Sequence, residues 1–180
     1  MSHAHTPDLA VPVSPVDHVL GAARAPVTIV EYGDFECPNC KQAAPALKHL
    51  VASFEGQVRL VFRHFPLEEV HPHALHAALA AEAAGAQGKF WQMHDLLFDN
   101  QAHLRLSQLR SYAAQLELDM EKYDSEMHDE LYLQRVREEI EGGRLSGVRS
   151  TPGIFIEGRR HDVSFGLGSL ADAVSAALRG

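Results

Sequence analysis

The chain reads Asp-Phe-Glu-Cys-Pro-Asn-Cys from residue 34 to residue 40, and this stretch decides the fold. It contains the only two cysteines of the protein, Cys37 and Cys40. The β-branched run at 27–30 predicts a strand before it, and apolar residues at helical spacing predict a helix after it, ending near residue 54. The two cysteines are therefore expected between a strand and a helix.

The position of Cys37 suggests a reactive thiol. Pro38 suits the first helical position, which makes Cys37 the N-cap residue. A thiolate there can accept backbone hydrogen bonds and lies at the positive end of the helix dipole, so we expect a lowered pKa and a sulfur that solvent can reach. Cys40 lies one turn on, on the apolar face, and should be more buried. This arrangement predicts thiol–disulfide exchange in which Cys37 attacks and Cys40 resolves the mixed disulfide.

The cysteine pair also allows two other interpretations. A structural disulfide is one, although a bridge closing so short a loop constrains the unfolded chain little. Half of a metal site is the other, although a structural zinc site needs four ligands and the chain has no second cysteine pair. Redox function is the preferred interpretation.

Composition limits the classes of protein that fit. With 180 residues, 46% apolar and 22% charged, the chain suits one globular domain with a sizeable core. The formal charge of −8 and the lack of a basic stripe argue against nucleic acid as a partner, and no apolar run has the length of a membrane span. The first twenty residues lack Lys, Arg and an apolar core, so we expect no signal peptide, no membrane partner and a cytoplasmic location. A dithiol there is usually catalytic or regulatory.

Glu31 is the first candidate outside the cysteine motif. It lies in the predicted strand at 25–32, whose two faces are both apolar, as in a central strand covered on both sides. Buried there, its carboxyl would have a raised pKa and could carry a proton for Cys40. The alternative is that Glu31 lies at the exposed end of the strand, and the pattern alone does not decide between them.

The rest of the chain alternates between sheet and helix. An edge strand is expected at 16–20 and another strand at 58–65, with a helix between them that contains Pro45. Five helices are expected after His71, with Pro72, Ser107 and Asp119 near the starts of three of them.

The end of the chain returns to strand patterns. A strand is expected at 154–156, a turn at Glu157 and Gly158, a return strand through Phe165, and a last helix capped by residue 168 or 169. We expect a flexible segment at 1–15, a core made of 16–70 and 148–180, and a helical insertion at 71–147. The fold class is α/β, with a mixed central sheet flanked by helices.

These residues resemble the DsbA-like branch of the thioredoxin superfamily over 16–180. The resemblance rests on four segments: Asp-His-Val-Leu-Gly at 17–21, Val-Glu-Tyr-Gly-Asp-Phe-Glu-Cys-Pro-Asn-Cys at 30–40, Phe-Arg-His-Phe-Pro-Leu at 62–67 and Gly-Val-Arg-Ser-Thr-Pro-Gly-Ile-Phe-Ile-Glu-Gly-Arg at 147–159. It implies a thioredoxin fold with a helical insertion, and a disulfide oxidoreductase that needs no cofactor and no metal.

The resemblance also assigns roles to individual residues. It implies Cys37 as the nucleophile, Cys40 as the resolving thiol and Glu31 as the buried acid of the family. Pro152 matches the cis-proline that faces the cysteine pair. The resemblance places Thr151, Pro152 and Pro38 at the substrate, because the exposed backbone of Thr151 could pair with an extended peptide.

The chain departs from the family pattern between the cysteines, at Ser150, where relatives commonly have Gly, and at Gly153. The residues between the cysteines are Pro-Asn, where the strongest oxidants of the family have Pro-His. Asn39 is neutral, and Asp34 and Glu36 add negative charge nearby, so the fall in the pKa of Cys37 should be limited. The pair should therefore be less oxidising. Gly153 follows Pro152 where a side chain is common, and either widens the groove or permits a bend.

The leading hypothesis is a thiol–disulfide oxidoreductase that acts on protein or peptide disulfides and is recycled by a redox partner not named by the sequence. The sequence also allows a redox switch that docks a partner without turnover, and a metal-binding protein that combines the thiolates with histidines. A glutathione-conjugating enzyme is weaker because it would not need Cys40. The direction of electron flow, the substrate and the oligomeric state stay open.

Overall fold

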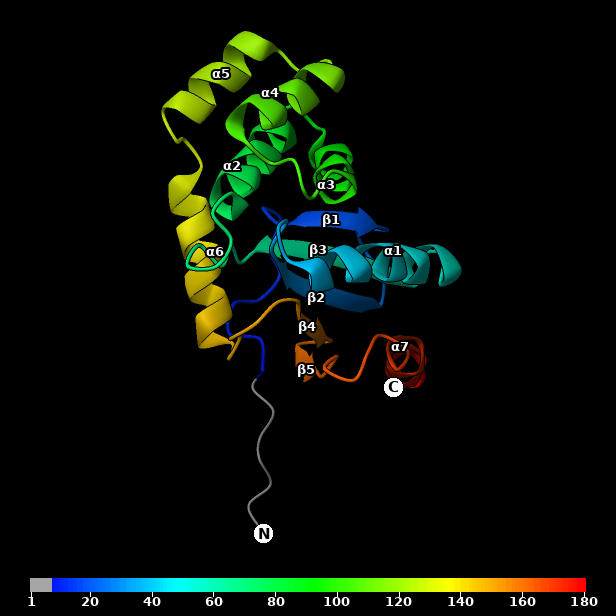
Figure 1. Ribbon diagram of the computed structural model, residues 1–180. Coiled ribbons are helices and arrows are strands. Elements are labelled where there is room, and N and C mark those ends of the chain that lie inside the picture. The colour runs from blue at the N-terminus through cyan, green and yellow to red at the C-terminus, as the bar shows by residue number, and fades with distance from the viewer. Residues whose placement is uncertain (1–7) are drawn as a thin grey trace. The chain divides into compact units, whose positions relative to one another are not determined.

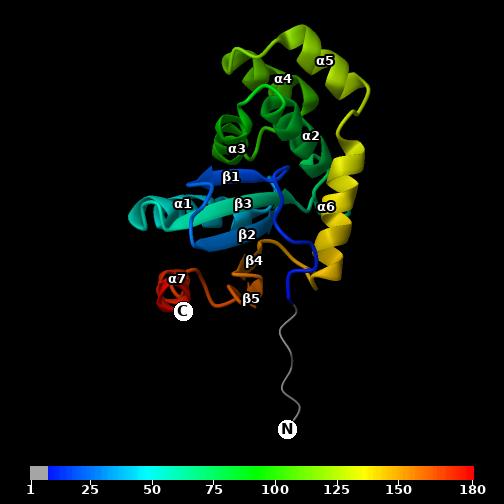
Figure 2. The same ribbon diagram turned by 180° about the vertical axis from the view of Figure 1, so that it is seen from behind.

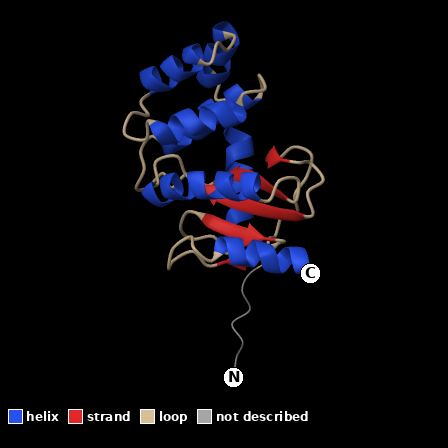
Figure 3. Ribbon diagram, turned by 90° about the vertical axis from the view of Figure 1, so that its right-hand side faces the viewer, coloured by secondary structure: helices blue, strands red, loops and turns tan. Residues whose placement is uncertain are grey.

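The computed structural model describes residues 8–180 and orders its elements as the sequence predicts (Figures 1 and 3). The strands are β1 (His18–Gly21), β2 (Val27–Gly33), β3 (Val58–His64), β4 (Gly153–Ile156) and β5 (Arg159–His161). The helices are α1 (Pro38–Ser53), α2 (Ala74–Gly85), α3 (Phe90–Asp99), α4 (Leu106–Gln115), α5 (Met120–His128), α6 (Leu133–Leu145) and α7 (Leu170–Arg179).

The five strands form one mixed sheet in the order β1-β3-β2-β4-β5 (Figure 1). β2 and β3 run parallel. The Val27 N–H donates to the Gln57 carbonyl where both strands begin, and the Phe65 N–H donates to the Gly33 carbonyl where both strands end. The pairs β1–β3, β2–β4 and β4–β5 are antiparallel. The mixed sheet, the edge position of β1 and the central position of β2 confirm the predictions.

The described chain divides into two compact units. The sheet unit contains the described residues up to Tyr32, with Ala43–Arg63 and Glu141–Gly180, and the helical unit contains Gly33–Gln42 and His64–Ile140. The predicted helical insertion at 71–147 is defined by the order of elements along the chain, and its bounds differ from those of the two units. It stays a prediction. The cysteine motif falls in the helical unit.

A buried arginine ties the first described segment to the sheet unit. Arg63 donates to both carboxylate oxygens of Asp17, at 2.9 and 3.0 Å, and to the Tyr32 hydroxyl at 2.9 Å. It also donates to the carbonyls of Val11 and Pro12. The side chains of Arg63 and Asp17 are only 4% and 6% exposed, so this ion pair belongs to the core of the unit.

The sequence predicts a flexible segment at 1–15, and residues 1–7 of it lie outside the described residues. The described part is hydrogen-bonded within the sheet unit. Leu9 N–H donates to the Gly158 carbonyl at 2.8 Å, and Ala10 N–H donates to the Ser146 hydroxyl at 2.9 Å.

Two helices cover one face of the sheet. α7 and the part of α1 from Ala43 onward lie along this face (Figures 1 and 3). In the helical unit, α2 packs against α3, α4 and α5 (Figure 2). Among residues 8–180, none of the helices has both the length and the apolar character that a membrane crossing requires.

The predicted hairpin is confirmed, but its second strand is shorter than expected. Glu157 and Gly158 both have positive φ, as a two-residue turn between antiparallel strands requires. β5 ends at His161 rather than continuing to Phe165. The physical reason is the Asp162 side chain, which accepts hydrogen bonds from the backbone and hydroxyl of Ser164 and so forms a local turn.

Two helix starts also differ from the predictions. α2 begins at Ala74, two residues after Pro72. α4 begins at Leu106, so Ser107 lies inside the helix; the Gln108 side chain accepts from Arg105 N–H instead. The predicted cap at Asp119 is confirmed, since its carboxylate accepts from Lys122 N–H.

Candidate active site

The dithiol lies at the start of α1, as expected. Pro38 is the first helical residue, and the Cys37 carbonyl accepts the hydrogen bond from Lys41 N–H at 3.1 Å. Both cysteines are thiols in the structure. Cys40 is 0% exposed and Cys37 5% exposed, so the order of exposure is as expected, while Cys37 is less exposed than the sequence analysis expected.

Asp34 anchors the loop before Cys37. Its side chain is fully buried, and Oδ1 accepts from Glu36 N–H at 2.7 Å. Oδ2 accepts from Leu67 N–H at 2.8 Å and lies 2.8 Å from Nδ1 of His71. Three partners thus stabilise this carboxylate, which ties the loop to the segment before α2. The Asp34 carboxylate therefore holds the loop before Cys37 in place, a role that the sequence did not indicate.

The other two residues before Cys37 are held as firmly. The Glu36 carboxylate accepts from His73 N–H at 2.9 Å. The Phe35 ring is 1% exposed and packs among the rings of His64, His94 and Phe98, with centroids 6.0, 5.8 and 5.0 Å away. An aromatic pocket of the helical unit therefore fixes the loop that carries Cys37.

Gln101, in the turn after α3, completes this support. Its amide nitrogen donates to the Phe35 carbonyl at 2.8 Å and to the Cys37 carbonyl at 2.9 Å. Gln101 is not among the residues predicted from the sequence, because a glutamine in a polar turn carries no local signal. The pairing of His71 with Asp34 was not predicted either.

The remaining predicted residues lie in the sheet unit. Glu31 is 0% exposed and faces Ile154 across the β2–β4 ladder, so the alternative of an exposed strand end is excluded. Thr151 and Pro152 precede β4 and are buried. The peptide bond between them is cis. The predicted residues therefore fall into two groups: Cys37, Pro38 and Cys40 in the helical unit, and Glu31, Thr151 and Pro152 in the sheet unit.

The structure also explains Gly153, for which the sequence left two explanations. A Cβ atom at this position would come within 2.9 Å of Cγ2 and 3.0 Å of Cγ1 of Val148, which is fully buried. Close packing against Val148 in the sheet unit therefore requires glycine here.

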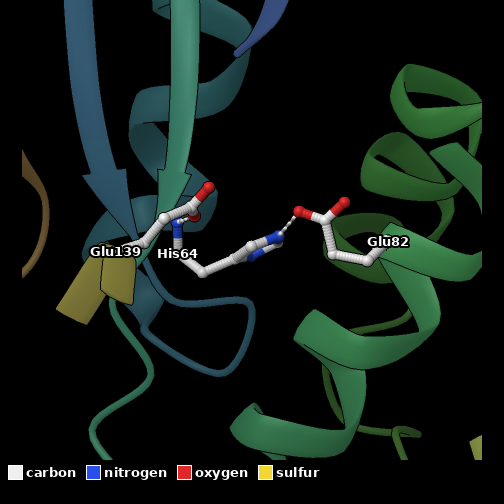
Figure 4. A group of neighbouring side chains, drawn as sticks. All are labelled: His64, Glu82 and Glu139. Carbon is white, nitrogen blue, oxygen red and sulfur yellow. Dashed lines mark hydrogen bonds and ion pairs between the residues drawn. The ribbon is translucent and has the colours of Figure 1, made fainter. Parts of the chain in front are cut away.

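A buried ionic group lies at the end of β3 (Figure 4). Nε2 of His64 lies 3.1 Å from the Glu82 carboxylate, and His64 N–H donates to the Glu139 carboxylate at 2.5 Å. Ligand atoms of these three residues lie within 4.8 Å of one another, and neither cysteine belongs to this group. The guanidinium of Arg135 lies 2.8 Å from Glu82 and 3.3 Å from Glu139, so it already supplies positive charge to both carboxylates.

The charge of His64 follows from this environment. Burial is the largest influence on its pKa and lowers it, but the hydrogen bond to Glu82 and the charges of Glu139 and Glu82 together raise the pKa above 6.5. Burial raises the pKa of Glu139, and the charge of His64 opposes that rise. The pairing of the imidazole with Glu82 therefore favours its protonated form, while the backbone N–H of His64 binds Glu139.

The pairing of His64 with Glu82 predicts a pH-dependent stability. The pKa of His64 is higher in the folded state, so its contribution is complete below about pH 6.5 and is lost as the pH rises through the folded value. The free energy of unfolding, measured with urea at a series of pH values, should decline over this window. Glu82→Gln should flatten the decline, whereas the exposed control Glu138→Gln should not. A His64 resonance titrating at or below 6.5 would contradict the prediction.

Comparison with known proteins places the fold. The family model described as Thioredoxin matches residues 13–175. This chain belongs to the thioredoxin family. The α/β thioredoxin fold predicted from the sequence is thereby confirmed.

Solved structures agree with the assignment of this chain to the thioredoxin family. BdbD from Bacillus subtilis superposes with a TM-score of 0.84 at 22% identity, over 99% of this chain and 100% of that one. A thioredoxin-like oxidoreductase from Silicibacter pomeroyi DSS-3 gives 0.82 at 28% identity, over 93% and 95%. Wolbachia pipientis alpha-DsbA1 gives 0.78 at 21% identity, over 94% of each chain. The DsbA-like resemblance seen in the sequence is confirmed.

Curated relatives of this thioredoxin-family chain carry a different name. A Salinispora arenicola protein named Na(+)/H(+) antiporter NhaA 1 is 49% identical over 174 residues, which is 96% of this chain but 26% of that protein. The chain therefore spans about a quarter of the length of that relative.

Proposed function

We propose that this protein is a thiol–disulfide oxidoreductase acting on protein or peptide disulfides through Cys37 and Cys40. The observation that carries the proposal is the Cys-Pro-Asn-Cys motif at the start of α1, with its preceding loop held by Asp34, Phe35 and Glu36. A fixed loop keeps the N-cap geometry that favours a thiolate. The 28% identical oxidoreductase of the same fold supports the same chemistry.

The exchange proceeds in two balanced steps. The Cys37 thiolate attacks one sulfur of the substrate disulfide, forming a mixed disulfide and releasing the other substrate sulfur as a thiolate. Deprotonated Cys40 then attacks the Cys37 sulfur, forming the Cys37–Cys40 disulfide and releasing the second substrate thiolate. The substrate gains two electrons and the protein loses two. A recycling partner restores the dithiol, and the same steps in reverse oxidise a substrate dithiol.

We further propose roles for the other site residues. Glu31 serves as the proton acceptor for Cys40, and its complete burial supports a carboxyl whose protonation is sensitive to its surroundings. Thr151 and Pro152 bind an extended substrate segment, and Pro38 contacts substrate beside Cys37. The cis bond before Pro152 is the feature that the family resemblance predicts at this position. The compartment we propose is the cytoplasm.

An insulin-disulfide reduction assay with glutathione as the reductant tests the function. We expect the wild-type protein to accelerate the precipitation of reduced insulin chains severalfold over glutathione alone. A protein that forms a reversible disulfide but gives no acceleration would favour the alternative of a redox switch without turnover. Stoichiometric zinc or copper retained after dialysis under reducing conditions would favour the metal-binding alternative.

The two thiols should differ in reactivity. Cys37 should react before Cys40 with a limiting amount of iodoacetamide, because Cys37 keeps the larger exposed fraction and lies at the N-cap position. Fragment-ion mass spectrometry of the tryptic peptide 25–41, which contains both cysteines, locates the label. Labelling of Cys40 first would reverse the proposed roles.

The curated relatives favour a second candidate function. Because proteins named Na(+)/H(+) antiporters contain a segment 49% identical to this chain, we infer that the oxidoreductase could serve a membrane transporter of that kind. Such a role would add a membrane protein to the partners, against the expectation from the sequence. Everted vesicles that contain the antiporter test this role: sodium-driven proton exchange should differ between added reduced and oxidised protein, and equal rates would contradict it.

A further inference from the structure

Gln101 makes an unusual pair of contacts with the loop that carries Cys37. One amide nitrogen donates to the carbonyls of Phe35 and Cys37, at 2.8 and 2.9 Å. Both partners are carbonyl oxygens, which only accept hydrogen bonds, so the nitrogen of the amide and not its oxygen must face them. The amide nitrogen of one side chain therefore faces two main-chain carbonyls of the loop that ends at Cys37.

These two carbonyls matter for the charge of Cys37. One belongs to Cys37 itself and the other to Phe35, so both are negative ends of peptide dipoles in the segment that carries the sulfur. The Cys37 carbonyl already accepts from Lys41 N–H, and the Gln101 hydrogen bond engages its second lone pair. Each hydrogen bond offsets the negative end of a carbonyl dipole and fixes the peptide plane that orients the first N–H groups of α1.

Other contacts already hold the rest of the loop, so Gln101 is not needed to attach it. Asp34 and Glu36 are anchored through their carboxylates, and Phe35 through its ring. Among the hydrogen bonds described for the loop, one from Gln101 is the side-chain contact that reaches the Cys37 main chain. Loss of Gln101 should therefore leave the loop attached while changing the electrostatic surroundings of the sulfur.

We propose that Gln101 is a positioning residue that favours the thiolate of Cys37 by donating to the Phe35 and Cys37 carbonyls. The inference rests on the proposed function and extends it to a residue 64 positions along the chain from Cys37. Gln101→Glu is the sharpest change, because a carboxylate of the same shape cannot donate and places negative charge beside two carbonyl oxygens. Gln101→Met removes the donor without adding charge.

The pH profile of alkylation tests the proposal. In a Cys40→Ser background, iodoacetamide reacts with the one remaining cysteine, and below the thiol pKa its rate follows the thiolate fraction. Gln101→Glu should lower the rate at pH 6 by about tenfold, which corresponds to a pKa rise of about one unit, and Gln101→Met by a smaller factor. Gln108→Glu is the matched control, because that side chain accepts from Arg105 N–H and a carboxylate can do the same.

The outcomes separate the two proposals. A profile of both Gln101 variants that superimposes on the parent profile, with or without a fall in the thermal unfolding midpoint, would overturn the role of Gln101 and leave the exchange function standing. A shift as large in Gln108→Glu would also overturn it, because added charge alone would then explain the effect. A parent profile with the pKa of an ordinary thiol, about 8.5, would instead count against the thiolate on which the proposed function depends.

Discussion

Cys37→Ser should reduce the rate of insulin-disulfide reduction to that of glutathione alone. A serine hydroxyl does not form a disulfide, so the first step of the exchange is lost completely rather than slowed. Cys40→Ser should also lose most of its turnover, but for a different reason: Cys37 can still attack, and the mixed disulfide then persists because only glutathione from solution, and no thiol within the protein, can resolve it. The assay, run with both variants and the parent, measures these rates.

The two variants control for each other. Both replace a buried sulfur by oxygen, so a loss caused by disturbed packing would affect them alike. Only Cys40→Ser should be recovered as a covalent adduct with a disulfide peptide, detected as an added mass in the intact protein. Cys37→Ser with parental activity, and an adduct on Cys40 in that variant, would contradict the assignment of roles.

Arg63→Met should give the largest loss of stability. The change leaves the Asp17 carboxylate buried without its bidentate partner and removes the hydrogen bonds to Tyr32 and to two backbone carbonyls. Breaking a buried ion pair from one side costs about 3–5 kcal/mol, a large part of the stability of an ordinary domain. Urea unfolding of the parent and the variant at neutral pH measures the difference.

The chain offers a close control for this prediction. Arg110 forms the same two-point contact with Asp124, at 2.9 Å for each bond, but the two side chains are 56% and 46% exposed. Arg110→Met should change the unfolding midpoint little, because an exposed pair is already solvated. Equal losses in the two variants would show that burial is not what makes the Arg63 pair important.

The sequence predicted the parts of the fold that depend on local patterns. The strand before Cys37, the helix beginning at Pro38 and the turn at Glu157–Gly158 follow from periodicity and from proline and glycine chemistry. The end of β5 was missed because Asp162 forms a turn with its own side chain, which no strand pattern indicates.

The sequence did not predict how the loop before Cys37 is supported. Asp34 meets His71 across 37 residues, and Gln101 meets Cys37 across 64. Such contacts depend on how the helices pack, whereas propensity and periodicity report only on neighbours along the chain. From the sequence, Asp34 and Glu36 are therefore only negative groups near a thiolate, whereas in the structure both carboxylates hold the loop.

The most direct test of the central claim is the redox state of the two cysteines themselves. The protein is equilibrated with a series of glutathione ratios, its thiols are trapped by alkylation, and the tryptic peptide 25–41 is weighed. We predict one transition in which Cys37 and Cys40 lose their labels together, and the unlabelled peptide is two mass units lighter than the unalkylated dithiol peptide. The midpoint should be less oxidising than that of a Cys-Pro-His-Cys pair. A peptide that keeps both labels at every ratio, or that carries glutathione on each cysteine without an internal disulfide, would contradict the account.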